Sequence, residues 1–315
     1  RIPISPGLIK QVLDSKPDVL ISDGFMQWTY AALAVRALKR IPHVMCYERT
    51  AHTERNAGRL RIWYRKIVSR WIDAIDCNGI LCGEYVRSLG FDSKRLTFGH
   101  MVADISGMSR TIQNIANEDI VKVKKELKIP PKGLMILFVG QLIPIKGVDQ
   151  LLTAWKQFKS HCKENCTLVY VGYGRLEQPL RDRIVNEKIQ DVILIGGIDY
   201  DSIAQYYKAA DCFILPTVED NWSLVVPEAM ACGLPVATTI YNGCHPELIT
   251  KENGWVFDTY NEQSIIDTLQ NIVNNKERLK EMGEVSKRIV SKHTAERAAQ
   301  SIMAAIDIAQ KHCKK

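Results

Sequence analysis

Two carboxylates separated by seven residues occur in the segment Asp220-Asn-Trp-Ser-Leu-Val-Val-Pro-Glu228. The segment follows an apolar strand, so Asp220 falls on a strand-to-helix loop and Glu228 on the first turn of a helix that Pro227 opens and Gly233 closes. Ligands of open α/β sheets collect at the carboxyl ends of strands and at helix N-termini. Both carboxylates can therefore accept hydrogen bonds from one polyol, while free N–H groups face an anion. This combination suits a nucleotide sugar.

A simpler interpretation of the same pair stays open. Glu228 can merely complement the helix dipole, and Asp220 can cap a turn. The spacing alone does not separate the two interpretations.

Three upstream segments extend the pattern, namely 136–152 (ILFVGQLIPIKGVDQLL), 167–175 (TLVYVGYGR) and 192–217. With the acidic pair, they resemble in order the family-four retaining glycosyltransferases of the GT-B fold, also called glycosyl transferases group 1. Asp220 stands in place of the first Glu of that family's Glu-x7-Glu motif. The resemblance implies an α/β protein with two Rossmann-like parallel-sheet domains facing across a cleft. It implies a hexosyltransferase-type enzyme that moves a sugar from a nucleotide-diphosphate donor to an acceptor hydroxyl with retention.

The resemblance also assigns the donor site. Lys146 stands where the family places a lysine against the donor diphosphate, as a point charge suited to phosphate oxygens. The family's partner arginine is replaced by Gln141, which supplies no charge, so leaving-group stabilisation should be weaker. Asp220 would hold hydroxyls of the transferred sugar, and Glu228 would accept both ribose hydroxyls. The remaining donor-binding residues are Gly140, Gly172, Gly174, Asn221, Trp222, Ser223 and Leu224.

The three glycines have an alternative role. Gly lets a backbone approach a ligand closely. It is equally the default residue of strand-to-helix turns.

On the acceptor side, segment 41–48 resembles the family strand that ends in a histidine near the reacting carbon. Glu48 takes the place of that histidine, and His52 is the candidate replacement. Either side chain would assist the acceptor hydroxyl. The alternative is that both are structural groups at a strand end.

Strands alternating with helical lengths predict two parallel-sheet domains. We expect an N-terminal acceptor-side domain at 1–121, a nucleotide-sugar-binding domain at 122–292, and a C-terminal helix at 293–315 that returns to the first domain. The predicted strands are 18–22, 42–47, 80–82, 96–98, 135–139, 167–171, 192–195, 212–215, 236–239 and 255–257. The first strands and glycine-rich loop of the family have no counterpart, so we expect an incomplete N-terminal domain.

Residues 55–71 contain six cations and no acid. Drawn as a helix, Leu60, Trp63, Tyr64, Ile67, Val68 and Trp71 share one face. Basic and aromatic residues together are typical of a helix on anionic lipid, where Arg59, Arg61, Arg65, Lys66 and Arg70 would meet the headgroups. The alternative is that the apolar stripe packs on the N-terminal sheet and the cations are solvated.

Composition limits the remaining classes. A chain of 315 residues with 46% apolar content can fill two cores. Nine cysteines without paired C-x-x-C sets favour a reduced compartment and no zinc site. The sequence has no long apolar run, and its first seven residues contain no signal-peptide region, so we expect a cytoplasmic protein, peripheral on the inner face if the basic helix binds lipid.

Partners follow from the same observations. We expect a nucleotide sugar and a carbohydrate or lipid-linked acceptor, as in polysaccharide or glycolipid biosynthesis, and no nucleic acid, because no recognisable binding module occurs. No Asp-x-Asp motif lies beside the donor loop, so we expect no catalytic metal and no cofactor. A nucleotide-sugar-binding protein without transferase activity is the main alternative. A dinucleotide oxidoreductase fits poorly, because the Gly172-x-Gly174 turn lacks the third glycine.

Overall fold

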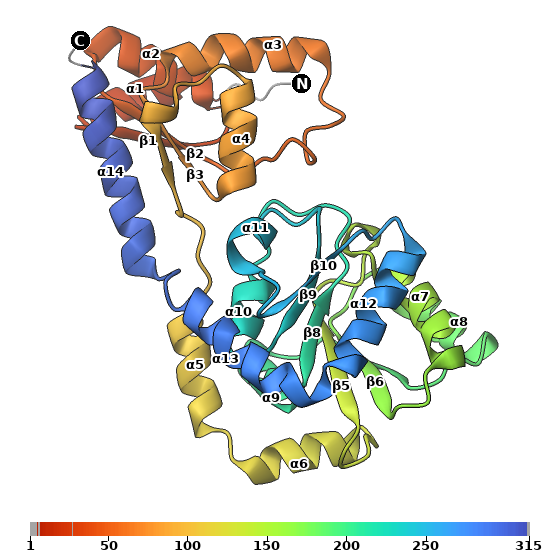
Figure 1. The fold of residues 1–315 in the computed structure, drawn as a ribbon. Coiled ribbons are helices and arrows are strands. Elements are labelled where there is room, and N and C mark those ends of the chain that lie inside the picture. The colour runs from red at the N-terminus through yellow and green to blue at the C-terminus, as the bar shows by residue number, and fades with distance from the viewer. Residues whose placement is uncertain (1–4, 6, 27, 314–315) are drawn as a thin grey trace. The chain divides into compact units, whose positions relative to one another are not determined.

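The chain forms two parallel β-sheets, one of four strands and one of six, in the part that the computed structural model describes, residues 5, 7–26 and 28–313 (Figure 1). Each sheet belongs to its own unit. The first unit is the chain up to Val102 together with the segment from Ala295, and the second is Ala103–Thr294. Residues 103–121, expected with the N-terminal domain, group with the second unit. The first seven residues, expected to contain no signal-peptide region, lie mostly outside the described residues.

The first unit has the strand order β1-β2-β3-β4. Its strands are β1 (Leu20–Asp23), β2 (His43–Tyr47), β3 (Ala74–Cys77) and β4 (Leu96–Phe98). Its helices are α1 (Leu8–Asp14), α2 (Thr29–Lys39), α3 (Arg59–Val68), α4 (Ile80–Ser88) and α14 (Ala295–Cys313), with 3-10 turns η1 (Ser69–Trp71) and η2 (Ser93–Arg95).

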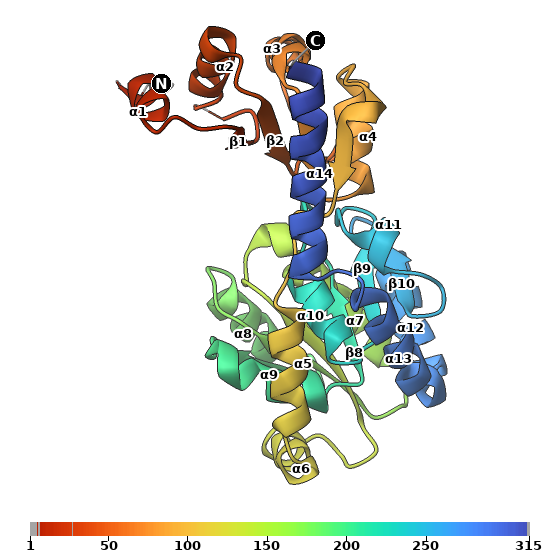
Figure 2. The ribbon, with the colours of Figure 1, turned by 90° about the vertical axis from the view of Figure 1, so that its left-hand side faces the viewer.

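Successive side chains of β2 and β3 point to opposite faces of the sheet, so the first unit has two cores. Met45 and Ile75 face a cluster that includes residues of α4. Val44 and Ala74 face the opposite way, onto Ala305 and Ala309 of α14. The C-terminal helix thus covers the second face of the four-stranded sheet, and it contacts β2, β3 and β4 (Figure 2). The small alanines let the helix approach the sheet closely.

The strand predicted at 80–82 is wrong, because these residues begin α4. The third strand is instead β3, which ends at Cys77, three residues before the predicted strand. Two acids interrupt the apolar pattern there, yet both are buried. Asp73 accepts two hydrogen bonds from Arg36, at 2.7 and 2.6 Å, and Asp76 accepts one from Ser301 of α14 at 3.0 Å. A paired acid can occupy a buried position that sequence patterning assigns to apolar residues.

His43 of β2 gives a testable pH dependence. It is fully buried, and its Nε2 lies 2.7 Å from the Ser22 hydroxyl. Burial lowers the pKa of His43 from 6.5 to about 4. In the unfolded chain His43 is protonated near pH 6.5, whereas in the folded chain it stays neutral until about pH 4. The free energy of unfolding therefore decreases as the pH falls through this window.

We expect the free energy of unfolding to drop by about 2 kcal/mol between pH 6.5 and 5 through this residue. Denaturant unfolding of wild type and His43→Gln at pH 7, 6 and 5 measures the effect. The variant should lose part of the acid sensitivity. Equal pH slopes in both proteins would show that His43 does not contribute.

The second unit has the strand order β10-β9-β8-β5-β6-β7, all parallel. Its strands are β5 (Leu134–Val139), β6 (Cys166–Val171), β7 (Val192–Gly196), β8 (Cys212–Leu215), β9 (Val236–Thr239) and β10 (Gly254–Phe257). Its helices are α5 (Ile105–Asn114), α6 (Asn117–Glu126), α7 (Val148–His161), α8 (Glu177–Asn186), α9 (Tyr200–Ala209), α10 (Val225–Ala231), α11 (His245–Leu248), α12 (Glu262–Asn274) and α13 (Leu279–Val290), with η3 (Pro144–Lys146) and η4 (Lys276–Arg278).

All six strands of this sheet were predicted, to within about one residue at each end. Buried apolar runs such as Leu134–Val139 and Cys166–Val171 are typical of parallel strands that helices cover on both faces. The strand order reverses at β5, which lies between β6 and β8. Ligands of such sheets bind beyond the carboxyl ends of the strands at this reversal.

Candidate functional site

The loops that follow β5 and β8 meet at the carboxyl edge of the second sheet. The backbone N–H of Val218 donates to the carbonyl of Ile145 at 2.9 Å, and the Thr217 hydroxyl donates to the same carbonyl at 3.0 Å. Gly147 ends the turn η3 with φ +68°, and a Cβ there would lie 1.9 Å from the Pro216 carbonyl oxygen. Only glycine fits this position, so the contact between the loops depends on it.

This contact brings Lys146 and Asp220 together. The Lys146 ammonium donates to Oδ2 of Asp220 at 2.5 Å, while Oδ1 of Asp220 accepts from the backbone N–H of Trp222 at 3.1 Å. The side chains are 23% and 13% exposed, so the pair is half-buried and still reachable from solvent. A cation and an anion at one point suit a ligand that carries both phosphate oxygens and hydroxyls.

The Asp220 loop is held on its other side by the loop after β9. Asp220 forms a parallel bridge with Asn242, and its carbonyl accepts from the N–H of Gly243 at 2.9 Å. A Cβ at Gly243 would lie 1.8 Å from the Asn221 carbonyl oxygen. Asp220, whose side chain is shorter than that of glutamate, therefore lies on a loop that two neighbouring loops hold in place.

Glu228 lies in the first turn of α10, and its carboxylate contacts α9. The hydroxyl of Tyr207 donates to Oε2 of Glu228 at 3.3 Å. Tyr207 is fully buried, with its ring 5.9 Å from that of Phe213. Sequence reasoning missed Tyr207, because the sequence does not show the direction in which its hydroxyl points.

The helix that carries Glu228 does not begin at Pro227 as predicted. It begins at Val225, with Leu224 as the N-cap, and Pro227 is its third residue. Proline fits there because N–H groups of the first turn have no acceptor within the helix. The helix ends at Ala231 with Cys232 as its C-cap, and Gly233 follows with φ +80°.

Two of the three predicted donor glycines touch backbone of a neighbouring loop. A Cβ at Gly172 would lie 1.9 Å from the carbonyl oxygen of Gly140, and one at Gly174 would lie 2.4 Å from that of Leu142. The loops after β5 and β6 therefore pack backbone against backbone. Gly140 itself has φ +153°, and Gln141 beside it is exposed.

The segment between the two acids is mostly buried. Trp222 and Ser223 are buried, and among the described residues the indole Nε1 and the Ser223 hydroxyl form no hydrogen bond. The Trp222 ring lies 6.4 Å from that of His293, just before Thr294 ends the unit. Asn221 is half-buried, and Leu224 is exposed.

The predicted acceptor residues Glu48 and His52 lie in the first unit, on the loop after β2. The Glu48 carbonyl accepts a hydrogen bond from the Asn78 side-chain amide at 3.2 Å. The His52 carbonyl accepts one from the Arg55 guanidinium at 2.6 Å. Glu54, which sequence reasoning missed, anchors the loop. Its buried carboxylate lies 2.7 Å from the Arg65 guanidinium. Both candidate side chains are half-buried on a loop that this ion pair holds to α3.

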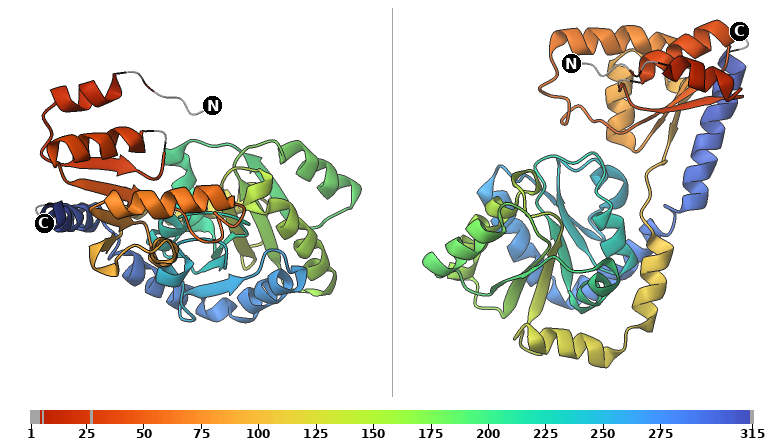
Figure 3. Two further views of the ribbon diagram at one scale, coloured as in Figure 1. Left: turned by 90° about the horizontal axis from the view of Figure 1, so that it is seen from above. Right: turned by 180° about the vertical axis from the view of Figure 1, so that it is seen from behind.

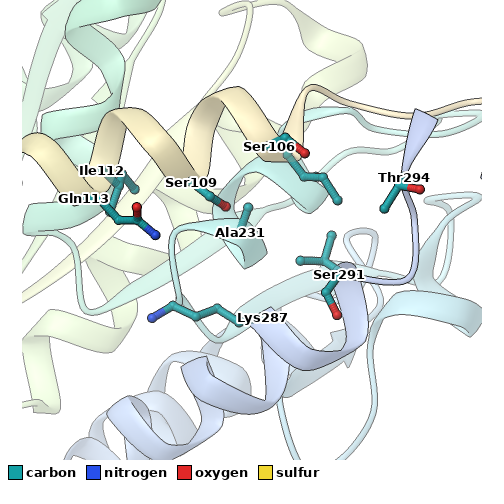
Figure 4. A pocket seen from close by; sticks show the side chains of 10 residues that line it. Ser106, Ser109, Ile112, Gln113, Ala231, Lys287, Ser291 and Thr294 are labelled. Carbon is teal, nitrogen blue, oxygen red and sulfur yellow. The ribbon is translucent and has the colours of Figure 1, made fainter. Parts of the chain in front are cut away.

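A separate groove of about 380 Å³ runs between α5 and α13, with Ala231 of α10 between them (Figure 4). Its lining residues are Ile105, Ser106, Ser109, Ile112, Gln113, Ala231, Lys287, Val290, Ser291 and Thr294. None of the predicted site residues is among them. Among the helices of the described residues, none combines the length with the apolar character that a membrane-spanning helix needs.

Comparison with known proteins agrees with this geometry. The family described as glycosyl transferases group 1 matches residues 119–289, which is more than half of the chain. An uncharacterized glycosyltransferase of Methanocaldococcus jannaschii is 26% identical over 166 residues, 53% of this chain and 46% of its own length. A GDP-mannose-dependent monoacylated alpha-(1-6)-phosphatidylinositol monomannoside mannosyltransferase of Corynebacterium glutamicum is 28% identical over 173 residues, 53% of this chain and 45% of its own.

The fold is similar to that of Anabaena HepE, solved in complex with UDP. The TM-score is 0.80 at 17% identity, over 96% of this chain and 82% of that one. The chain spans about half the length of the curated relatives it matches.

Proposed function

The chain belongs to the glycosyl transferases group 1 family, and on that premise we propose that it moves a sugar from a nucleotide-diphosphate donor to an acceptor hydroxyl with retention of the anomeric configuration. The observation that carries the proposal is the Lys146–Asp220 pair at the carboxyl edge of β5 and β8. It supplies a cation for phosphate and a carboxylate for sugar hydroxyls at the place where α/β sheets bind ligands.

In the proposed reaction, the bond from the anomeric carbon to the diphosphate breaks and a bond to the acceptor oxygen forms on the same face. Negative charge builds on the leaving diphosphate, which takes up the acceptor's proton. Lys146 stabilises that charge, and a fixed cation is most effective in a site partly screened from water. Asp220 orients the sugar, and Glu228 accepts hydrogen bonds from the ribose hydroxyls. The Tyr207 hydroxyl positions the Glu228 carboxylate.

Donor and acceptor classes follow from the relatives. The Corynebacterium relative is named for GDP-mannose and a phosphatidylinositol mannoside, and HepE was solved with UDP. We propose a nucleotide sugar as donor and a carbohydrate or lipid-linked acceptor, as in polysaccharide or glycolipid biosynthesis. Glu48 or His52 would assist the acceptor hydroxyl. Neither a metal ion nor a cofactor enters this scheme.

A donor panel tests the proposal. UDP-, GDP- and ADP-sugars are titrated against the full chain and followed by thermal shift, which a bound ligand raises by mass action. The donor that binds is then offered with oligosaccharide and lipid-linked acceptors, and the anomer of the product is read by NMR. Product of inverted configuration contradicts retention, and failure of every nucleotide sugar to bind contradicts the proposal as a whole.

A second candidate, a nucleotide-sugar-binding protein without transferase activity, is favoured by two departures from the family pattern. Gln141 replaces the arginine beside the donor diphosphate, and Glu48 replaces the acceptor-side histidine. This protein would bind a donor in the thermal-shift panel yet give no transfer to any acceptor.

Gln141→Arg should raise kcat about tenfold, because a charge-assisted hydrogen bond to the diphosphate contributes about 1.5 kcal/mol more than a neutral one. Gln141 is exposed, so the longer side chain has room. Steady-state kinetics with the donor identified above measures the change. Gln141→Met, which keeps the length of the side chain and carries neither charge nor hydrogen-bond donor, is the control. A lower rate with unchanged donor affinity would show that glutamine has a function of its own.

A further inference from the structure

Helix α3 packs on the first unit with a different face from the one its apolar stripe predicts. Val68 is buried at 4% exposed, and Ile62 packs against the same core. Between them, the buried Arg65 guanidinium lies 2.7 Å from the Glu54 carboxylate and donates to the Tyr85 hydroxyl at 2.9 Å. Residues 62, 65 and 68 form the inner face of the helix.

The opposite face of α3 and η1 is apolar and exposed. Leu60 is 77% exposed, Trp63 60%, Tyr64 42% and Trp71 53%. The alternative in which this stripe packs on the sheet is therefore wrong for these four residues, although it holds for Val68. Large apolar side chains that share one exposed face mark an interaction surface.

Exposed cations border this face. Arg59 and Lys66 share one flank of α3, since positions seven residues apart lie close together around the axis, and the exposed Arg70 follows in η1. Arg61 lies on the other flank, and the exposed Arg55 precedes the helix. No acid occurs from Arg55 to Trp71. Both views of Figure 3 show α3 (orange) on a different side of the first unit from α14 (dark blue).

Arg65 does not belong to the headgroup-binding set predicted from the sequence. Burial lowers the pKa of Arg65, but the hydrogen bonds to Glu54 and Tyr85 and the nearby charges of Tyr47 and Glu54 together outweigh it, and the net pKa is raised. The guanidinium thus stays charged and holds α3 to the loop after β2. Arg61 also lies 3.8 Å from the Glu54 carboxylate, while Arg59 and Lys66 are exposed on another flank of α3.

We propose that the α3 face, defined as Leu60, Trp63, Tyr64 and Trp71 with Arg55, Arg59, Arg61, Lys66 and Arg70, binds the surface of an anionic phospholipid bilayer. Aromatic and leucine side chains enter the boundary between headgroups and acyl chains, while Lys and Arg meet the anionic headgroups. The surface goes beyond the transfer reaction proposed above, and bilayer binding needs no turnover.

A second copy of the chain is the poorer occupant. In a twofold-symmetric dimer the same patch meets itself. Five exposed cations would then face five cations, and like charges brought together across an interface cost several kcal/mol. A bilayer with anionic lipid supplies the opposite charge together with an apolar interior.

Vesicle co-sedimentation of the full chain tests the proposal. Phosphatidylcholine vesicles with about 30% phosphatidylglycerol should bind the protein at low salt, and binding should fade as NaCl rises to about 0.5 M. Each cation near an anionic surface changes the partition coefficient about fivefold, or about 1 kcal/mol. Arg59→Gln, Lys66→Gln and Arg70→Gln combined should lower binding about a hundredfold.

A matched control replaces three exposed cations elsewhere in the first unit, as Lys10→Gln, Lys39→Gln and Lys94→Gln. It should bind like wild type. Trp63→Phe with Trp71→Phe should remove most quenching of tryptophan fluorescence by brominated lipid. Thermal unfolding confirms that each variant is folded.

Three results would overturn the proposal. The first is no binding to anionic vesicles at low salt. The second is an equal loss in the Lys10, Lys39 and Lys94 variant. The third is a dimer that Trp63→Ser abolishes, without vesicle binding. Donor affinity is measured separately by thermal shift. A loss of vesicle binding can thus be distinguished from a failure of the proposed transfer reaction.

Discussion

Lys146→Met is expected to lower kcat for sugar transfer about a hundredfold to a thousandfold, the cost of removing one fixed group that stabilises developing charge. The variant keeps an unbranched side chain of similar length and loses only the ammonium. It also leaves the Asp220 carboxylate, 13% exposed, without the cation 2.5 Å away. The lost ammonium and the unpaired carboxylate both act on the donor once it is bound. We therefore expect kcat to fall more than donor affinity. Single-turnover kinetics at saturating donor measures the chemical step.

Two variants separate charge from structure at this position. Lys146→Arg keeps the cation and should retain far more activity than Lys146→Met. Asp220→Asn leaves Lys146 free of its carboxylate partner and should impair donor binding while the diphosphate cation stays. If Lys146→Met keeps wild-type turnover and unfolds at the wild-type temperature, the ion pair is a structural link between two loops and nothing more.

Glu228→Ala should weaken donor binding about a hundredfold, because a carboxylate that accepts two ribose hydroxyls contributes about 3 kcal/mol through charge-assisted hydrogen bonds. The loss is expected in the dissociation constant for the nucleotide as well as the nucleotide sugar, since the ribose belongs to both. Calorimetric titration with the nucleoside diphosphate measures it directly.

Tyr207→Phe is the matched control for this position. It removes only the hydroxyl that donates to Oε2 of Glu228 at 3.3 Å and leaves the buried ring in place. A smaller loss, about threefold to tenfold, is expected, because the carboxylate loses a positioning contact while keeping its charge. Unchanged affinity in Glu228→Ala, with the fold intact, would make Glu228 an ordinary residue of a helix first turn.

Much of the second unit could be predicted from the sequence. Continuous apolar runs such as Leu134–Val139, bounded by Gly and Pro, identify buried parallel strands, because a strand covered by helices on both faces is apolar at every position. The first unit was harder to predict. The buried acid Asp73 precedes its strand β3 and the buried acid Asp76 lies within it. Only their partners Arg36 and Ser301, distant in sequence, make that burial possible.

By itself, the sequence determined the α/β class and the strands of the larger sheet, because periodicity and turn chemistry are local. The family resemblance added the residues of a candidate donor site. Only the tertiary structure decided which residues meet. The pairing of Lys146 with Asp220 requires β5 and β8 to be neighbours, and the support of Glu228 by Tyr207 requires α9 to pack against α10. The same holds for α3, where the Arg65–Glu54 pair turns Trp63 outward. A helix can bury only one face against one neighbour, and its three-dimensional partners select that face.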